Sequence, residues 1–356
     1  MNSPKNIVYL YSEVLPYAIT TMRALRDNFN ANIDCISWDK NKVTPFVPQD
    51  MERIRFHKRS EFNKQTLINF IESRRPDVLC ISGRMDGAYL DVAVHFRAKG
   101  VPVISGCDNQ WYGSVKNWVA ALFSRYIYHR YFDYFWVPGR RQFEFAKRIG
   151  YSNKNILGYA LSADVDRFRS AYEARKMQHA GKFPRTIVYA GRFSQEKGIE
   201  VLVKAFTEFK SETTNDWKLV LVGAGPVKVE STSDIQVLDY MTPDELVAKS
   251  SDFGVFCLPS IWDHWGVVIH EFTAAGMPMI SSDGVGAADT FIIEGFNGYL
   301  FKSRDVNALK AAFVKMTSKT DEELWEMGDR SFEISETITP TKAAHSFMSV
   351  LDKSVG

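Results

Sequence analysis

The sequence lacks paired cysteines, long apolar runs and a strong excess of charge of either sign. Its four cysteines are scattered without a C-x-x-C pair, so free and mostly buried thiols are favoured over disulfides or metal ligands. No apolar run reaches the ~18–20 residues that a membrane-spanning helix needs, and the first residues lack the layout of a signal peptide. The formal net charge of +2 indicates no overall electrostatic field. We therefore expect a cytoplasmic protein.

At 356 residues the chain is longer than one hydrophobic core usually supports, so we expect two domains. Short apolar runs predict strands at 6–11, 33–38, 77–82, 101–104, 185–190, 217–222, 234–238, 254–258 and 279–281. Amphipathic segments between them predict helices at 19–29, 64–74, 86–99, 199–210 and 243–249, the last with Thr242 as its N-cap. This alternation predicts an α/β protein with a doubly wound parallel sheet in each half. A polar stretch between 168 and 182 predicts the linker, which gives domains at 1–168 and 169–335 and a terminal helical segment at 336–356.

The segment from 261 to 278 places two carboxylates, Asp263 and Glu271, eight residues apart. An apolar strand at 254–258 precedes them, and Gly266 between them is a poor residue for a helix interior. The simplest layout puts Asp263 on a loop and Glu271 one turn into a helix. Both carboxylates then lie at the carboxyl end of one strand, which is where open α/β sheets bind their ligands.

A second motif, Gly191-Arg192-Phe-Ser-Gln-Glu-Lys197-Gly198, follows a predicted strand directly and opens a helix. Two cations on a glycine-bounded turn beside a helix N-terminus predict a diphosphate clamp. Arg192 can bind phosphate oxygens bidentately, whereas Lys197 acts as a point charge. The alternative is a solvated loop with an internal pair between Glu196 and Lys197.

Together these motifs resemble the retaining, nucleotide-sugar-dependent glycosyltransferases of group 1, which include glycogen synthase-like and mannosyltransferase-like enzymes. That family usually has E-x-F-G-x-x-x-x-E-A-x-A-x-G-x-P, where this chain has Asp263 for the first Glu, Trp265 for the Phe, and Phe272 for the Ala after Glu271. The resemblance implies the GT-B fold, in which two Rossmann-like domains face a cleft. It also implies that the N-terminal domain binds the acceptor, that the C-terminal domain binds the donor, and that the last helix packs back on the N-terminal domain.

The resemblance implies roles for individual residues as well. Arg192 and Lys197 would neutralise the departing diphosphate, Glu271 would accept hydrogen bonds from the ribose, and Asp263 would face the sugar and phosphates. The further candidates for donor binding are Gly191, His264, Trp265, Gly266, Val267, Asp239 and Tyr240. The alternatives are a surface pairing role for Glu271 and an ordinary exposed histidine at 264.

In the N-terminal domain, Asp108 is the candidate for a catalytic polar group that faces the acceptor hydroxyl. Its alternative is a loop aspartate that caps the next helix. Asp164 and Asp166 fit the D-x-D pattern of metal-dependent transferases, but with Phe168 they resemble the interdomain D-x-x-x-F of this family. We therefore expect no metal and no cofactor, with a nucleoside-diphosphate sugar as the co-substrate.

Residues 111–150 combine many aromatics with seven Lys and Arg against two acids. Such a mixture suits a surface that touches anionic lipid. A core helix at 118–130 followed by a strand at 134–137 also explains it, and we favour this second interpretation because Pro138 and Gly139 end an ordinary strand. A peripheral contact with the inner membrane face stays open.

We therefore predict a metal-independent, retaining hexosyltransferase that moves a sugar from a nucleoside-diphosphate donor to the hydroxyl of a carbohydrate or lipid-linked acceptor. This reaction belongs to glycan, polysaccharide or glycolipid assembly and involves no nucleic acid. Two alternatives share the fold: a GT-B isomerase or phosphorylase, and a non-catalytic partner subunit. The joint presence of Arg192, Lys197 and Glu271 favours the enzyme.

Overall fold

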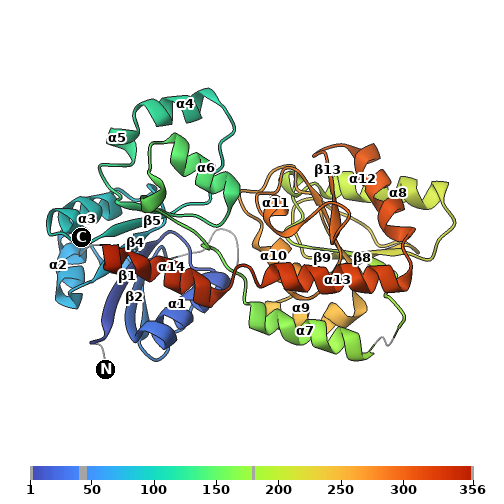
Figure 1. Ribbon diagram of the computed structural model, residues 1–356, viewed down its shortest axis with the longest axis horizontal. Helices are drawn as coiled ribbons and strands as arrows, with labels where there is room; N and C mark the ends of the chain where they lie inside the picture. Colours follow the sequence, from blue (N-terminus) through green and yellow to red (C-terminus); the bar gives the residue numbers. More distant parts are fainter. Residues whose placement is uncertain (1–2, 40–45, 179–180, 354–356) are drawn as a thin grey trace. The chain divides into compact units, whose positions relative to one another are not determined.

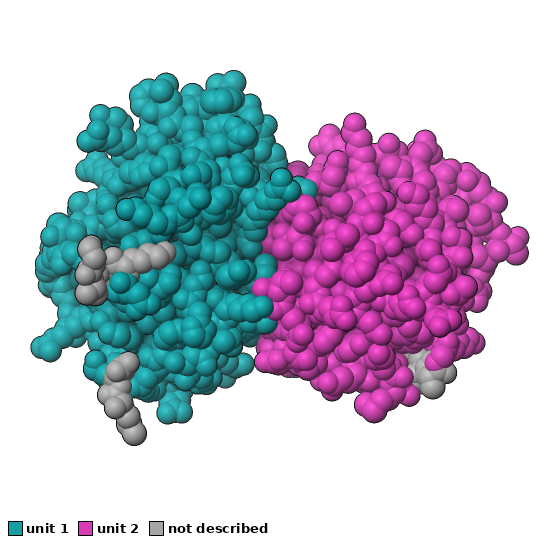
Figure 2. All heavy atoms as spheres, in the orientation of Figure 1, with its two compact units in different colours: residues 1–162, 338–356 teal, residues 163–337 magenta. Residues whose placement is uncertain are grey.

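A computed structural model describes residues 3–39, 46–178 and 181–353. The chain divides into two compact units, and each is described by itself (Figure 2). Unit 1 comprises Met1–Ser162 with Ile338–Gly356, and unit 2 comprises Ala163–Thr337. Residues 179–180 of the predicted linker and 354–356 of the predicted terminal segment lie outside the described residues.

Unit 1 is built on a seven-stranded sheet in the order β3-β2-β1-β4-β5-β6-β7, with every neighbouring pair parallel (Figure 1). The strands are β1 (Lys5–Tyr11), β2 (Ala31–Ser37), β3 (Ile54–Lys58), β4 (Val78–Ile81), β5 (Val103–Gly106), β6 (Tyr134–Trp136) and β7 (Ile156–Leu157). The helices are α1 (Pro16–Phe29), α2 (Lys64–Arg74), α3 (Gly87–Ala98), α4 (Val115–Leu122), α5 (Ser124–Ile127), α6 (Arg140–Arg148) and α14 (Pro340–Lys353), with 3-10 turns at Arg59–Glu61 and Asn153–Asn155.

The sheet of unit 1 is covered on both faces. Along β1, Ile7 and Tyr9 belong to one buried cluster, whereas Val8 and Leu10 belong to the other. This alternation follows from the two-residue period of a strand. The terminal helix α14 completes the first cluster, where Phe347 stacks on Tyr9 with ring centroids 5.7 Å apart.

Unit 2 has a six-stranded sheet in the order β10-β9-β8-β11-β12-β13, again parallel throughout. Its strands are β8 (Thr186–Ala190), β9 (Lys218–Val222), β10 (Ile235–Leu238), β11 (Val255–Leu258), β12 (Met279–Ser282) and β13 (Gly298–Phe301). Its helices are α7 (Val165–Gln178), α8 (Ile199–Glu212), α9 (Pro243–Lys249), α10 (Val267–Ala274), α11 (Ala288–Phe291), α12 (Val306–Thr317) and α13 (Asp321–Ser335), with 3-10 turns at Gln195–Lys197 and Ser250–Asp252. The predicted pair of doubly wound parallel sheets is confirmed.

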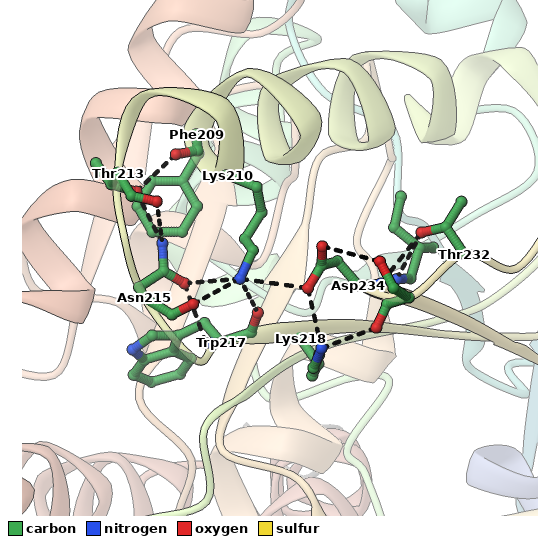
Figure 3. Close-up of polar contacts among 10 residues, drawn as sticks. Phe209, Lys210, Thr213, Asn215, Trp217, Lys218, Thr232 and Asp234 are labelled. Atoms are coloured by element: carbon green, nitrogen blue, oxygen red, sulfur yellow. Dashed lines mark hydrogen bonds and ion pairs between the residues drawn. The ribbon is translucent and has the colours of Figure 1, made fainter.

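Local side-chain chemistry explains where several elements of unit 2 begin and end. Thr242 caps α9 in a reciprocal capping box with Glu245, as predicted from its position before Pro243. In the last turn of α8, the Lys210 ammonium donates to the carbonyl oxygens of Asn215 at 2.7 Å and Trp217 at 3.2 Å. It also lies 3.3 Å from a carboxylate oxygen of Asp234 (Figure 3). These contacts join the end of α8 to the starts of β9 and β10.

The segment predicted as a linker is the helix α7, and Arg175 anchors it. The Arg175 side chain is fully buried and donates to the carbonyl oxygens of Phe253, Gly254, Ala275 and Gly276 at 2.6–3.2 Å. Its burial lowers the pKa of the guanidinium to about 9. The change from unit 1 to unit 2 lies between Ser162 and Ala163, whereas the predicted boundary at 168 falls inside this helix.

The favoured interpretation of residues 111–150 is wrong in its main element. Instead of one core helix at 118–130, the structure has two short helices, α4 and α5, neither with a buried residue. Trp118 is 60% exposed. The strand predicted after them is present as β6. The sequence shows the apolar period of α4 but not which side of the helix meets the core.

Candidate functional site

Most of the predicted site residues of unit 2 lie where the sheet changes its winding direction. From the centre of the sheet, β8, β9 and β10 follow one another toward one edge, and β11, β12 and β13 follow one another toward the opposite edge. The strands β8 and β11 are neighbours, with Val255 beside Ile187 and Phe256 beside Val188. A change of winding direction of this kind marks the place where open α/β sheets bind ligands.

The loops after β8 and β11 pack directly on each other. Gly198 has a φ of +70°, and a Cβ atom there would lie 2.1 Å from the Pro259 carbonyl oxygen. Next to this contact, the Ile261 amide donates to the Glu196 carbonyl oxygen at 2.8 Å. A side chain at 198 would separate the loops, so glycine is required for the approach as well as for the backbone conformation.

Lys197 and Asp263 meet across this contact. The Lys197 ammonium lies 2.5 Å from a carboxylate oxygen of Asp263, and the two side chains are 24% and 16% exposed. The Asp263 backbone is fixed from the other side, because its amide donates to the Gly284 carbonyl at 3.0 Å and its carbonyl accepts from the Gly286 amide at 3.0 Å. The structure thus brings together one predicted cation and one predicted carboxylate in a rigid setting.

Arg192 lies on the same loop as Lys197 but is more exposed. Its guanidinium pairs with Glu196 at 2.7 Å, and 47% of its side chain is accessible. The Tyr189 hydroxyl donates to the Arg192 carbonyl at 2.8 Å, and a Cβ at Gly191 would lie 2.9 Å from that hydroxyl. The alternative pair between Glu196 and Lys197 is therefore wrong, because Glu196 pairs with Arg192 and Lys197 pairs with Asp263. An exposed pair of this kind is weak, so Arg192 can exchange Glu196 for a phosphate group.

The N-terminus of α10 opens beside Asp263. Gly266 is the N-cap residue with a φ of +85°, and Val267 is the first helical residue. The first amides of a helix have no intrahelical acceptor and carry partial positive charge. They add an anion-binding element to the ammonium of Lys197. The predicted layout, with Asp263 on a loop and Glu271 one turn into a helix, is confirmed.

Glu271 is held in a poorly solvated setting on α10. Burial raises the pKa of its carboxyl to about 7, the positive charge of Arg167 opposes this rise, and the negative charge of Asp164 adds to it. Both neighbours come from the start of α7 and were not predicted as site residues. A carboxyl that titrates near neutral pH is typical of functional sites, and here it can accept or donate a hydrogen bond.

His270, the residue before Glu271, fixes this helix in place. Its Nδ1 accepts from the Ala163 amide at 3.0 Å, and its Nε2 donates to the Ser335 carbonyl at 3.0 Å. The imidazole also stacks on Phe291, with centroids 4.2 Å apart. An amide donor on one nitrogen and a carbonyl acceptor on the other select a single neutral tautomer.

The aromatic residues near Asp263 divide between the core and the surface. Trp265 is 2% exposed and packs on Phe291, so its side chain belongs to the core while its carbonyl accepts from the Ala287 amide at 2.8 Å. His264 is partly buried edge-on against Trp262, which is 48% exposed. Trp262 was not predicted, although its position next to Asp263 was a visible signal.

The remaining predicted residues lie farther away. Asp239 and Tyr240 follow β10 and are exposed, with Tyr240 at 54%. One strand, β9, separates β10 from β8, which at a spacing of about 4.8 Å puts these loops roughly 10 Å apart. The structure therefore does not join Asp239 and Tyr240 to the pair of Lys197 and Asp263.

Asp108 lies on unit 1, where it follows β5 and is exposed. Ser114 caps α4, so Asp108 does not serve the helix that follows it. Burial and the charge of Asp108 raise the pKa of Cys107 to about 12. A carboxylate oxygen of Glu13, just after β1, is buried without a hydrogen-bond partner among the described residues. Glu13 was not predicted as a site residue.

The cysteines and the D-x-D pattern were also considered from the sequence. All four cysteines are free thiols, three of them buried, as expected. Asp164 accepts from the Arg167 amide at 3.3 Å at the start of α7, whereas the Asp166 side chain is 91% exposed.

Within 3–39, 46–178 and 181–353, no three His, Cys, Asp or Glu side chains lie close enough to hold a metal ion. In the same residues, no helix has the length and apolarity to cross a bilayer.

Comparison with known proteins gives a family for the part of the chain that carries this site. Residues 172–330 match the family model of the glycosyl transferases group 1. The D-inositol 3-phosphate glycosyltransferase of Corynebacterium diphtheriae is 25% identical over 211 residues, which cover 54% of this chain and 49% of that protein. The chain thus matches about half the length of this relative.

Solved structures extend the likeness to the whole fold. A glycosyltransferase from Rickettsia africae superimposes with a TM-score of 0.75 at 12% identity, covering 99% of both chains. An Anabaena protein crystallised with UDP gives 0.73 at 10% identity, covering 98% of this chain and all of that one. The chain therefore has the GT-B fold, and its residues 172–330, with Lys197, Asp263 and Glu271 among them, match the model of the glycosyl transferases group 1.

Proposed function

We propose that the protein is a glycosyltransferase that uses a nucleoside-diphosphate sugar as its donor. The ion pair of Lys197 and Asp263 at the switch point of unit 2 carries this proposal, because it stands beside the N-terminus of α10. A cation and a helix N-terminus together suit a diphosphate. The group 1 family match and a structural neighbour crystallised with UDP support a nucleotide donor.

In the proposed complex the diphosphate lies against Lys197, the amides from Val267 onward, and Arg192 after it releases Glu196. Negative charge that develops on the leaving diphosphate is stabilised by these fixed groups. Glu271 accepts a hydrogen bond from the ribose, and Asp263 orients the sugar from within its ion pair. Asp239 and Tyr240 lie at the distance that the base of an extended nucleotide would reach.

The proposal includes retention of the anomeric configuration and independence of metal ions. Retention follows from the resemblance of the motifs, and the two cations of the 191–198 loop supply the charge that a metal would otherwise provide. The acceptor is a carbohydrate or a lipid-linked hydroxyl compound that binds unit 1, where Asp108 and Glu13 offer carboxylates. We place the protein in the cytoplasm, in agreement with four free thiols.

The test is a donor panel. Purified protein is incubated with UDP-, GDP- and ADP-sugars, in buffer with EDTA and in buffer with magnesium, and release of the nucleoside diphosphate is measured. We expect hydrolysis or transfer with at least one donor in EDTA and its loss in Glu271→Ala. No release from any donor, together with no thermal stabilisation by any of them, would favour a non-catalytic subunit.

A further inference from the structure

The apolar stripe of α4 faces solvent instead of the core of unit 1. Val115, Trp118, Val119 and Leu122 follow the i, i+3, i+4, i+7 spacing of one helix face, and they are 79%, 60%, 47% and 77% exposed. The helix contacts the core through Ala120 and Ala121. Small side chains thus attach the helix to the unit, while its large side chains remain outside.

This stripe is part of a larger apolar surface. The described residues include 17 large hydrophobic side chains that are exposed, and seven of them lie between 112 and 126. They form what we call the α4 patch: Tyr112, Val115, Trp118, Val119, Leu122, Phe123 and Tyr126. In Figure 1, α4 and α5 lie at the edge of unit 1, beyond its sheet. A concentrated apolar surface of this kind marks an interaction site.

The charged side chains within the stretch that forms the α4 patch are all cations. Between Asp108 and Asp133 the sequence contains no acidic residue. The same stretch contains Lys116, Arg125 and Arg130, all exposed. An apolar surface with exposed cations beside it is complementary to a lipid bilayer, whose interior is apolar and whose surface is anionic when it contains anionic lipid.

Arg148 extends this cationic border from a different helix. Its guanidinium lies 5.1 Å above the ring of Trp111. Trp111 in turn meets Trp118 edge-on, with centroids 5.2 Å apart. The fold therefore gathers cations and aromatic rings from α4, its preceding loop and α6 onto one surface.

We propose that the α4 patch docks on a lipid bilayer that contains anionic lipid. Trp118 and the exposed tyrosines have the amphipathic rings that suit the headgroup level. Val115 and Leu122 would enter the boundary of the acyl chains, and Lys116 and Arg125 would contact lipid phosphates. The inference is independent of the proposed transfer reaction, because it concerns unit 1 and needs no nucleotide.

The test is sedimentation of the full chain with vesicles of phosphatidylcholine, alone or mixed with phosphatidylglycerol. We expect binding to the mixed vesicles only, with a loss of at least tenfold in Trp118→Ser/Leu122→Ser. Removal of one cation, in Lys116→Gln or Arg125→Gln, should weaken binding by about fivefold. The matched control, Ile293→Ser/Val314→Ser, removes two side chains on unit 2 that are 53% and 46% exposed, and it should bind as the wild type does.

Two outcomes would overturn the proposal. Equal vesicle binding by the wild type and by a folded Trp118→Ser/Leu122→Ser variant would show that the α4 patch is not the contact. Absence of vesicle binding, combined with a wild-type dimer that becomes monomeric in the same variant, would assign the patch to a second copy of the chain. Circular dichroism and thermal melting show whether each variant is folded.

Discussion

The Lys197 ammonium reaches the Asp263 carboxylate across the two adjacent loops that leave β8 and β11. Because a bound diphosphate would compete with Asp263 for this ammonium, the ion pair sets the electrostatics of donor binding. Lys197→Met should weaken binding of the nucleoside diphosphate roughly tenfold to a hundredfold, since a hydrogen bond to a charged group contributes about 1.5–3 kcal/mol. Isothermal titration calorimetry measures the change.

The double variant Lys197→Met/Asp263→Asn tests the coupling directly. Lys197→Met leaves an unpaired carboxylate beside the phosphates, so the second substitution should restore part of the lost affinity. Lys204→Met, which removes an exposed cation from α8, should change little. Weaker binding by the double variant than by Lys197→Met would contradict the coupling.

Glu271 should make donor binding depend on pH. Burial raises the pKa of its carboxyl to about 7, so the ionised form that accepts a ribose hydroxyl becomes dominant only above that pH. We expect donor affinity to rise between pH 6 and pH 8 in the wild type. Glu271→Gln should bind more weakly and show no such rise, and a wild-type profile that stays flat would oppose the assigned role.

The same carboxyl should affect stability with the opposite sign. Its pKa in the folded protein lies above the ordinary value of 4.5, so the folded state holds a proton that the unfolded state has released. The free energy of unfolding should therefore fall as pH rises from about 4.5 to about 7. Urea denaturation at several pH values should show a smaller fall for Glu271→Gln than for the wild type.

Gly198→Ala tests the close approach of the two loops. Its matched control is Gly295→Ala, because Gly295 has a similar φ of +73° and no atom within 4 Å of the added Cβ. The control should lose only the backbone term of about 1–2 kcal/mol. Gly198→Ala should lose more and should also weaken donor binding, because its Cβ would overlap the Pro259 carbonyl. Equal effects in the two variants would mean that the loops adapt without cost.

His270→Phe tests the support behind Glu271. Phenylalanine preserves the stack on Phe291 but leaves the Ala163 amide and the Ser335 carbonyl without their partner. Each unsatisfied buried group costs about 1–3 kcal/mol, so thermal unfolding should occur several degrees lower. His95→Phe, at a partly exposed position paired with Glu72, should cost under about 1 kcal/mol. Similar melting temperatures for the two variants would contradict the support role.

The regular interior of the fold could be predicted because its strands are continuous apolar runs. Val78–Ile81 and Val255–Leu258 are buried at every position. The edge strand β3 escaped prediction, since only Ile54 of its five residues is buried. The helix α7 was not predicted because its largest buried side chain is Arg175. Arginine is seldom fully buried without partners, so the sequence shows no apolar face there.

The sequence predicted which residues form the candidate site, but not which side chains contact one another. Motif spacing indicated Lys197, Asp263 and Glu271, but the ion pair considered as an alternative joined Lys197 to its neighbour Glu196. The observed partner, Asp263, lies 66 residues away on the loop after β11, and the parallel pairing of β8 with β11 brings it near. The spacing likewise did not show that Trp265 is buried, because its contact with Phe291 depends on the packing of α11.

Arg175 gives α10 a fixed countercharge at the end opposite the proposed phosphate site. Two of the four carbonyls that it binds, those of Ala275 and Gly276, follow the last residue of this helix. A cation at the carboxyl end and an anion at the amino end both align with the helix dipole. An incoming diphosphate would therefore meet a helix whose negative pole is already compensated, so no counterion has to be recruited there when the ligand arrives.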